Sequence, residues 1–255
     1  MTMPENGAPR DWDGAAYDRV ADPMARWGAS VLDRLPLAGD ETVLDAGCGS
    51  GRVTEQLAER VPRGHVIALD GSPSMVEAAR GRLARFGDRV SFLVADLGAP
   101  LPIVPSSVDA ILSTATFHWV RDHDALFHGL ATVMRPGARL VAQCGGAGNI
   151  AGVRAAIAAA GEPWEGPWTF ATPDETRARL EAAGFIEVEA WLHDEPTQLE
   201  PGEPLRDYLR TVVLGAHLER RAPGNSPEAF VDAVAAGLGE PRIDYVRLNI
   251  LATRR

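Results

Sequence analysis

The segment VLDAGCGSG at residues 43–51 has the composition of a ligand-binding loop. Glycines at 47, 49 and 51 follow a short apolar run and precede the helical pattern at 52–61. Glycine lets the backbone turn tightly and approach a ligand closely, and the free amides at the start of a helix favour negative charge or lone pairs. Asp45, just before the turn, would repel a pyrophosphate, but it could pair with the cationic amino group of an amino acid.

The glycine spacing differs from the dinucleotide fingerprint G-x-G-x-x-G. The third glycine comes one residue early, and Arg52 occupies the expected position. Both this spacing and Asp45 disfavour a nicotinamide-dependent oxidoreductase, which is kept as the alternative.

Two further acidic residues end the next two apolar runs. Asp70 closes HVIALD (65–70), 23 residues after Gly47, and Asp96 closes RVSFLVAD (89–96). In open α/β sheets, ligands bind at the carboxyl ends of strands, and an acid in the position of Asp70 accepts hydrogen bonds from ribose hydroxyls. An aspartate in the position of Asp96 can accept a hydrogen bond from the exocyclic amine of adenine.

The elements that must position these acids alternate along the first half of the chain. Short apolar runs rich in β-branched residues, separated by helical patterns, indicate a parallel sheet with right-handed crossovers. The expected strands are 41–47, 65–70, 89–96, 108–116 and 138–145, and the expected helices are 52–61, 72–86 and 125–134.

The second half has a different character. An alanine-rich helix and a loop with two tryptophans occupy 149–171, and a helix at 172–185 precedes a strand at 186–192. Two amphipathic helices at about 202–221 and 226–239 come before a final strand at 243–254. The opening segment 12–35 also has helical spacing.

Composition excludes several classes of protein. The 255 residues are 45% apolar, and all 25 cationic residues are arginine, which excludes a Schiff-base lysine or a Walker-A lysine. A net charge of −10 without a basic run predicts no nucleic-acid partner. No stretch has the length of a membrane span or the apolar core of a signal peptide, so we expect a cytoplasmic protein that does not bind membranes. Cys48 and Cys144 lack the spacing of a zinc site.

In order and spacing, VLDAGCGSG, ALDGSPSM, VADL and DAILSTATFHWV resemble motifs of the class I S-adenosylmethionine-dependent methyltransferases. The resemblance covers roughly residues 40–145 and extends more loosely over the rest. It implies a doubly wound, Rossmann-like sheet of seven mostly parallel strands with the last strand antiparallel. In the strand order that it implies, the fourth strand lies between those of Cys48 and Cys144, so we expect no disulfide. The segments WDGAAYDRVADPMARWG and STATFHWV are similar to the small-molecule branch that includes trans-aconitate methyltransferase.

The resemblance implies S-adenosylmethionine as the cofactor. Asp45 and Gly47 would hold its methionine part, Asp70 its ribose, and Asp96 with Leu97 its adenine. Tyr17, Arg26 and Trp27 could fold over it as a lid, with Arg26 at the methionine carboxylate. The remaining residues expected near the cofactor are Cys48, Gly49, Gly51, Gly71, Ser72, Met75, Ala95 and Ser113.

Methyl transfer makes a modest catalytic demand, because the sulfonium is already activated and the enzyme mainly aligns the acceptor. A carboxylate needs no base, whereas a hydroxyl or carbon acid does. His118, beyond the fourth expected strand, is the best placed catalytic candidate, as a base or a substrate ligand, and His123 is second. Trp119, Gln143, Trp164 and Trp168 are further candidates for contact with the substrate.

We therefore expect a small N-terminal helical lid over residues 1–36 and a methyltransferase domain over 37–255, with cap insertions at about 149–171 and 200–240. The expected reaction is O-methylation of a small molecule, with a carboxylate as one acceptor. C- or N-methylation is the alternative. A binding module that keeps the cofactor without transfer is also open, and the motifs do not predict the oligomeric state.

Overall fold

The computed structural model describes residues 10–12, 22–221 and 226–255. Its main feature is a seven-stranded sheet in the order β3-β2-β1-β4-β5-β9-β6. Strand β9 runs antiparallel to both of its neighbours, and the other pairs are parallel. The fold class expected from the sequence is therefore confirmed. The strands are β1 (Thr42–Ala46), β2 (His65–Asp70), β3 (Val90–Val94), β4 (Val108–Thr114), β5 (Met134–Gly145), β6 (Phe185–Asp194) and β9 (Val246–Arg254).

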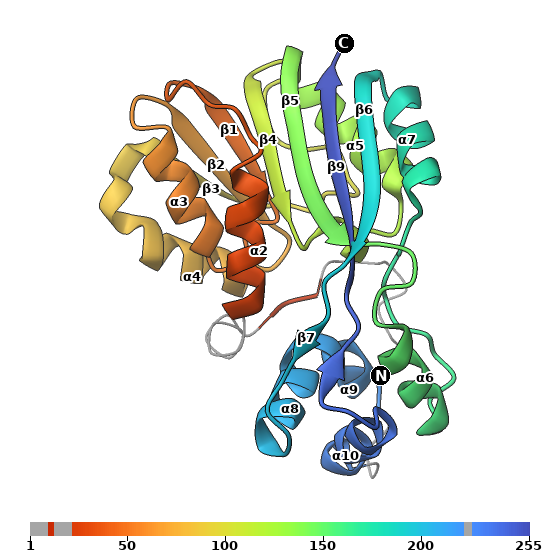
Figure 1. Ribbon diagram of the computed structural model, residues 1–255. Helices are drawn as coiled ribbons and strands as arrows, with labels where there is room; N and C mark the ends of the chain where they lie inside the picture. Colours follow the sequence, from red (N-terminus) through yellow and green to blue (C-terminus); the bar gives the residue numbers. More distant parts are fainter. Residues whose placement is uncertain (1–9, 13–21, 222–225) are drawn as a thin grey trace.

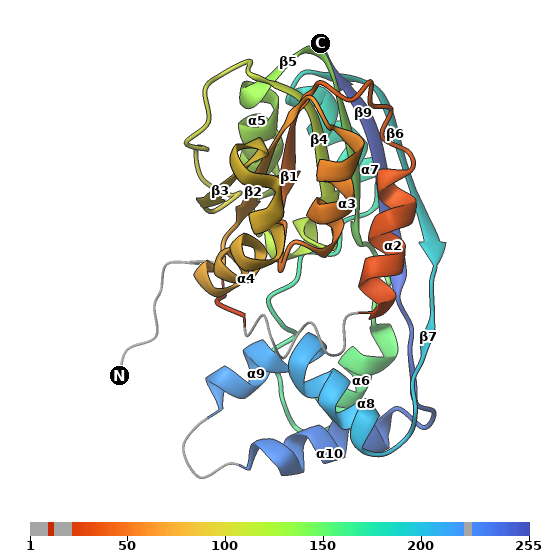
Figure 2. The same ribbon diagram turned by 90° about the vertical axis from the view of Figure 1, so that its left-hand side faces the viewer.

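Helices cover both faces of this sheet, as Figure 1 and Figure 2 show. Successive strand residues point to opposite faces, so Val43 joins the apolar cluster on one side and Leu44 the cluster on the other. One face is covered by α2 (Asp22–Leu32), α3 (Arg52–Arg60) and α4 (Pro73–Leu83), and the other by α5 (His123–Val133) and α7 (Pro173–Ala182).

Local sequence signals fix where several helices begin. Ser72 caps α4 by accepting from the amide of Met75, and Asp122 caps α5 by accepting from the amide of Ala125. The second cap starts α5 two residues before the expected position, because an aspartate side chain satisfies a free amide of the first turn. Strand β5 begins at Met134, four residues before the expected strand, and its pairing with β4 shifts between Val108 and Ala110.

A second group of helices lies beyond the carboxyl ends of the parallel strands (Figure 1). It contains α6 (Ala151–Ala159), α8 (Glu203–Tyr208), α9 (Gly215–Arg220) and α10 (Pro227–Gly237), together with the short strands β7 (Thr197–Gln198) and β8 (Arg242–Ile243). These elements share their own apolar cluster, which includes Ile157, Leu209 and Val231. We call them the cap. They fall largely within the two expected insertions, and a role in covering the substrate remains a prediction.

Two expected elements are divided in the structure. The final strand separates into β8, which pairs with β7 outside the main sheet, and β9. The helix expected at 202–221 contains a wide π turn, η3 (Leu209–Val213), closed by a hydrogen bond from the amide of Leu214 to the carbonyl of Leu209. In the described parts of the chain, no helix combines the length and apolarity needed to cross a lipid bilayer.

Candidate functional site

A cavity of about 520 Å³ lies between the carboxyl ends of the parallel strands and the cap. The loops after β1, β2, β3 and β4 form one wall, and cap residues form the other. Most of the residues expected at the cofactor meet here. The expected residues that line the cavity are Gly47, Cys48, Gly49, Asp70, Gly71, Met75, Ala95, Asp96, Leu97, His118 and Trp119, with Trp27 of the expected lid.

The glycine loop is shaped by backbone constraints that only glycine meets. Gly47 has φ +92°, and a Cβ there would lie 2.0 Å from Oγ1 of Thr116. The amides of Gly47 and Cys48 both donate to the carbonyl of Leu69, at 2.8 and 2.9 Å. Gly51 packs against Ala79 of α4 instead of lining the cavity. The loop therefore holds a fixed turn whose inner surface is backbone.

Both carboxylate oxygens of Asp70 accept hydrogen bonds from backbone amides of the neighbouring loops. One oxygen accepts from the amide of Gly49 and the other from the amide of Ser72, each at 2.9 Å. Burial raises the pKa of the Asp70 carboxyl above its usual value, although these backbone hydrogen bonds oppose the shift. A carboxylate fixed in this way can accept hydrogen bonds from a ribose diol. Ser72 itself caps α4 and does not line the cavity.

Asp45 lies behind the loop and does not line the cavity. Its Oδ2 accepts from the hydroxyl of Thr54 at 2.7 Å, and Oδ1 has no hydrogen-bond partner among the described residues. Burial, reinforced by the charge of Asp70, raises the pKa of Asp45 to about 7. The expected contact of Asp45 with the methionine part of the cofactor stays a prediction. A cationic ligand nearby would stabilise the ionised form of this buried carboxyl.

Asp96 and its neighbours form the wall expected for adenine. Asp96 Oδ1 accepts from the amide of Gly98 at 2.8 Å, so the side chain also fixes its own turn. Ala95 and Leu97 line the cavity beside it. Ser113 is buried on β4, where its hydroxyl donates to the carbonyl of Ala46 at 2.6 Å, away from the cavity.

His118 and Trp119 belong to a short turn, η2 (Phe117–Trp119), that follows β4. The His118 ring is 7% exposed and lines the cavity. Its Nδ1 accepts a hydrogen bond from the amide of Gly145 at 3.2 Å. Burial, together with the nearby charge of Arg247, holds the pKa of His118 well below its usual range. A neutral, firmly oriented imidazole therefore faces the cavity.

Four residues expected at the substrate do not line the cavity. Buried His123 bonds through Nε2 to the carbonyl of Phe117. Trp164 lies beside a separate hollow near α6, and Trp168 stacks on Phe170 with ring centroids 5.8 Å apart. Gln143 is buried on β5 and contacts Arg247 instead of the cavity. Tyr17 lies outside the described residues, and of Arg26 only the backbone, in α2, is described.

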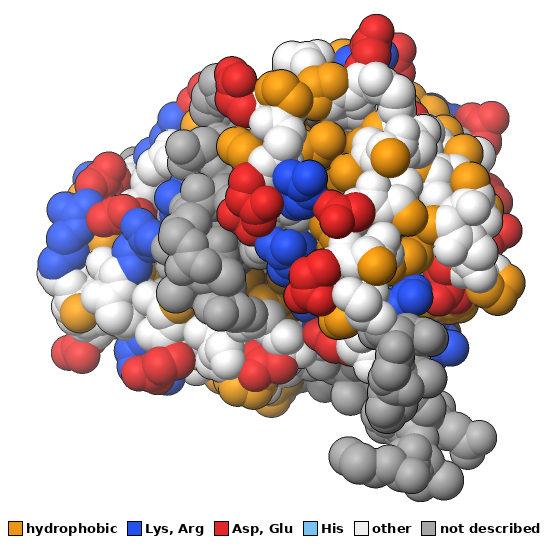
Figure 3. All heavy atoms as spheres, turned by 90° about the horizontal axis from the view of Figure 1, so that it is seen from below, with side chains coloured by type: hydrophobic (Ala, Val, Ile, Leu, Met, Phe, Trp, Pro, Cys, Tyr) orange, Lys and Arg blue, Asp and Glu red, His pale blue; other side chains and the backbone are white. Residues whose placement is uncertain are grey.

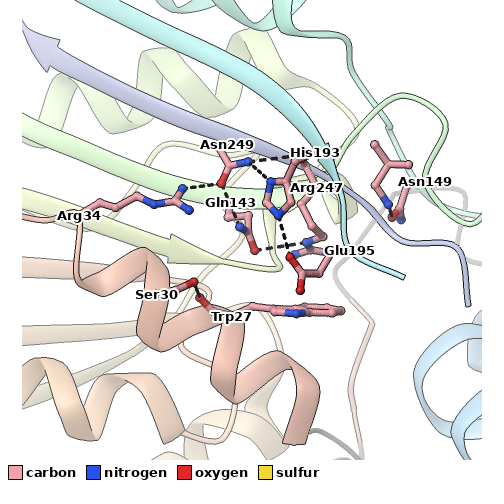
Figure 4. A network of polar contacts seen from close by, with 10 residues as sticks. Trp27, Ser30, Arg34, Gln143, Asn149, His193, Glu195, Arg247 and Asn249 are labelled. Atoms are coloured by element: carbon pink, nitrogen blue, oxygen red, sulfur yellow. Dashed lines mark hydrogen bonds and ion pairs between the residues drawn. The ribbon is translucent and has the colours of Figure 1, made fainter. Parts of the chain in front are cut away.

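The structure adds a cation that the motifs miss. Arg247 on β9 is 3% exposed, lines the cavity and places its guanidinium carbon 4.8 Å from the centre of the Trp27 ring. Its Nε donates to Oε1 of Gln143 at 3.3 Å, and Gln143 donates to Oδ1 of Asn249 at 2.9 Å. Figure 4 shows this chain of polar groups continuing to Arg34 and His193. The signal in the sequence is two polar residues, 247 and 249, alternating with apolar ones in a strand that the fold buries.

Residues 10–12 close one side of the cavity. Asp11 accepts from the hydroxyls of Ser72 and Ser74, at 2.5 and 2.8 Å, and these bonds lower the pKa of the Asp11 carboxyl. Arg10 bonds to Glu219 of the cap at 2.7 Å. Trp12 meets Trp119 edge to face, with ring centroids 5.1 Å apart. We call residues 10–12 the strap, since they join α4 to the cap across the cavity mouth.

The outer surface of the cap does not form a broad cationic field. Figure 3, which looks at the molecule from below, shows arginines beside acidic side chains over the part that it colours. Arg206 pairs with Asp232 and Arg210 with Asp207, each at 2.5 Å, on an exposed surface. No cluster of three or more histidine, cysteine or acidic side chains with metal-site geometry occurs among the residues that the structure describes.

Comparisons with known proteins agree with this geometry. Residues 43–137 match the model of a methyltransferase domain family. The chain is 31% identical to trans-aconitate 2-methyltransferase of Methylobacterium radiotolerans, over 93% of this chain and 94% of that protein. It is 30% identical to trans-aconitate 2-methyltransferase of an Azoarcus species, over 93% and 94%.

Solved structures show the same fold at lower identity. Phosphoethanolamine N-methyltransferase 2 of Haemonchus contortus, in complex with S-adenosyl-L-methionine, matches with a TM-score of 0.65 at 19% identity, over 95% of this chain and 56% of that chain. Geranyl diphosphate C-methyltransferase of Streptomyces coelicolor matches with a TM-score of 0.58 at 19% identity, over 99% and 88%. At these identities the likeness concerns the fold alone.

Proposed function

The chain belongs to the class I S-adenosylmethionine-dependent methyltransferases, and we propose that it methylates a carboxylate oxygen of a small organic acid. Membership of this family decides against the nicotinamide-dependent oxidoreductase that remained open from the sequence. It also makes S-adenosylmethionine the methyl donor.

The described residues fit this donor. Asp70 would accept from the ribose hydroxyls, Asp96 and Leu97 would border the adenine, and the backbone of Gly47 to Gly49 would follow the methionine part. The fit is supported by Gly47, because a Cβ there would collide with Thr116, so the cavity is bordered at this position by bare backbone. When bound, S-adenosylmethionine supplies a methyl group on a positively charged sulfur.

The observation that carries the acid acceptor is Arg247. A guanidinium that lines a ligand cavity favours an anionic ligand, because its charge-assisted hydrogen bonds to a carboxylate are stronger than hydrogen bonds to a neutral group. Gln143 and the face of Trp27 hold the Arg247 side chain in place. Arg247 comes from the sheet, so its position is set by the register of β9 on β5, in which Arg247 pairs with Gly145.

The same acceptor removes the need for a base. A carboxylic acid has a pKa of about 4, so it is ionised at neutral pH and can attack the methyl group directly. The protein then has to bring the two reactants into line, and alignment alone can supply roughly 7–11 kcal/mol of the barrier. The names of the relatives, trans-aconitate 2-methyltransferases at about 30% identity, support an acceptor of this kind.

An acceptor screen tests the proposal. Purified protein is incubated with S-adenosylmethionine and trans-aconitate, other di- and tricarboxylates, phenols and amines. Release of S-adenosylhomocysteine and the mass of the product are followed. We expect turnover with one or more acids, giving an ester that alkali hydrolyses. Methylation of only a phenol, an amine or a carbon centre would refute the carboxylate acceptor, and binding of the cofactor without any turnover would favour a binding module.

A pair of arginine variants links the acceptor to the site. Arg247→Met removes the buried cation, whereas Arg242→Met removes an exposed one on β8. We expect Arg247→Met to raise the KM for the acid by roughly 10- to 100-fold, which corresponds to the loss of a charged hydrogen bond. The KM for S-adenosylmethionine should stay unchanged in both variants, and Arg242→Met should behave as the wild type does.

A further inference from the structure

The two ring nitrogens of His118 have different surroundings. Nδ1 accepts a hydrogen bond from the backbone amide of Gly145 at 3.2 Å. A backbone N–H can only donate, so Nδ1 must carry a lone pair and no hydrogen. Gly145 ends β5, and a Cβ at this position would lie 2.7 Å from Nδ2 of Asn149 and 2.8 Å from Phe170, so the backbone that orients the ring has little freedom.

The groups packed around His118 keep the ring neutral. Arg247 from β9 is the nearby cation, and Gly145, whose amide binds the ring, is paired with Arg247 in the sheet. His123 from α5 is the other titratable group that affects His118, and it too is held neutral, because burial lowers its pKa. Phe170 stacks on the ring with centroids 5.9 Å apart. Burial and the positive charge of Arg247 both oppose protonation, so the pKa of His118 falls well below its usual range.

A neutral imidazole has one hydrogen on nitrogen. With the lone pair on Nδ1, that hydrogen belongs to Nε2, which leaves the ring without a second lone pair. A general base on this cavity would need its free lone pair on the nitrogen that meets the acceptor. Exchanging the hydrogen between the nitrogens would place N–H of the ring against N–H of Gly145 and would cost the bond that orients His118.

We propose that His118 donates a hydrogen bond from Nε2 to the acceptor and does not act as a general base. The inference rests on the proposed function for the nature of the acceptor, a carboxylate. One carboxylate oxygen accepts from His118 while the other forms the new O–C bond. The C–S bond of the donor breaks, its electron pair stays on sulfur, and no proton is transferred. His118 and Arg247 would thus hold the acid from two different elements of the fold, η2 and β9.

The first test reads the ring directly. Protein labelled with ¹⁵N in histidine and bound to S-adenosylhomocysteine is examined by long-range ¹H–¹⁵N correlation, and the His118 signals are identified by their loss in His118→Gln. We expect an unprotonated Nδ1 and a protonated Nε2 throughout the neutral pH range. Hydrogen on Nδ1, or a doubly protonated ring, would overturn the proposal. This measurement needs no turnover, so it stands even if no acid is a substrate.

The second test separates a donor from a base. His118→Gln keeps an N–H donor but has no basic nitrogen, and His118→Leu keeps neither. We expect the glutamine variant to retain kcat and a KM for the acid within a few-fold of wild type. The leucine variant should raise that KM roughly tenfold, as expected for one lost hydrogen bond. The KM for S-adenosylmethionine should not change.

The control is His128→Leu, which alters an exposed histidine on α5 and should leave both constants unchanged. A base would give another pattern: His118→Gln would be as inactive as His118→Leu, and kcat/KM of the wild type would fall at acidic pH with the titration of a histidine. If the wild type methylates an acid but the variants show the kinetics of a general base, only the donor role of His118 is overturned and the proposed function stands. A wild type that methylates no acid overturns the proposed acceptor, and the imidazole spectrum then decides the state of His118 independently.

Discussion

Nε of Arg247 donates to the side-chain carbonyl of Gln143 at 3.3 Å, and this bond joins the buried cation of the cavity to the centre of the sheet. The amide group of the same glutamine donates to Asn249 at 2.9 Å, and Asn249 also accepts from Arg34 at 2.5 Å. Gln143 is thus a positioning residue, which orients the guanidinium without contact with the cavity (Figure 4).

Gln143→Leu should weaken acceptor binding through Arg247. Loss of the acceptor atom frees the guanidinium to rotate, so we expect the KM for the acid to rise roughly tenfold while the KM for S-adenosylmethionine stays constant. Gln143→Glu should have a similar effect for another reason, because a carboxylate beside Arg247 competes with the substrate for its charge. Steady-state kinetics with each substrate varied in turn measures both. Gln198→Leu, at an exposed position on β7, is the control, and an equal rise in both KM values would refute a positioning role.

Asp70→Asn should mainly affect the cofactor. The asparagine keeps one acceptor oxygen, so the turn loses one of its two bonds, to Gly49 or to Ser72, and the ribose loses a charged partner. We expect the Kd for S-adenosylhomocysteine to rise by roughly 10- to 100-fold, as measured by calorimetry. Asp88→Asn, an exposed aspartate in the turn before β3, should have no effect. An unchanged Kd in Asp70→Asn would remove Asp70 from the ribose site.

Asp45 should make the stability of the ligand-free protein depend on pH. Burial raises its pKa from 3.8 to about 7, so between these values the folded protein holds a proton that the unfolded chain has released. The free energy of unfolding therefore falls as the pH rises through this window. Asp45→Asn cannot ionise and keeps an acceptor for Thr54.

We expect Asp45→Asn and wild type to be equally stable near pH 2.5, because the Asp45 carboxyl is then protonated in both the folded and the unfolded state. Near pH 8 the variant should be more stable by about 4 kcal/mol, at 1.36 kcal/mol for each unit of pKa shift. Urea unfolding at both pH values measures the free energy of unfolding of each protein. Subtracting the wild-type value from that of the variant at the same pH cancels the contribution of the other titrating groups. If the gap between the two proteins stayed constant across the window, the raised pKa of Asp45 would be wrong.

The strap should slow the release of the cofactor. Asp11 holds it to α4 through Ser72 and Ser74, and Arg10 holds it to the cap through Glu219. Asp11→Asn weakens the first attachment, so we expect release of S-adenosylhomocysteine several-fold faster than in wild type. Stopped-flow tryptophan fluorescence measures the rate, because Trp12 lies against Trp119. Asp194→Asn changes an exposed aspartate away from the strap, and an equal acceleration there would point to a general loosening of the fold.

The succession of strands and helices along the first half of the chain and the cofactor loops could be predicted from the sequence, because each apolar run borders a helical pattern and each acid ends a run. The place of β4 between β1 and β5 was expected only from the family resemblance. Asp70 and Asp96 line the cavity for this reason. Cys48 and Cys144 are free and buried, and β4 lies between their strands, as expected.

The expected site residues that do not line the cavity are those for which the direction of a side chain or the path of a loop decides the contact. Asp45 and Ser113 lie on strands at the right height, but each points to a partner inside the fold, Thr54 or Ala46. Trp164 and Trp168 belong to a long loop whose path depends on packing against the cap. Arg247 was missed because a strand expected to be apolar gives no motif, although its alternation of polar residues marks the buried network.

The charge that would select the acceptor and the wall that would shape it come from different parts of the chain. Arg247 stands on the central sheet, whereas Val212 of the π turn η3 and Ala216 of the cap helix α9 line the cavity from the opposite side. Replacing the cap helices while keeping β9 would therefore change the carbon skeleton that fits the cavity and would leave the cationic anchor for an acid in place.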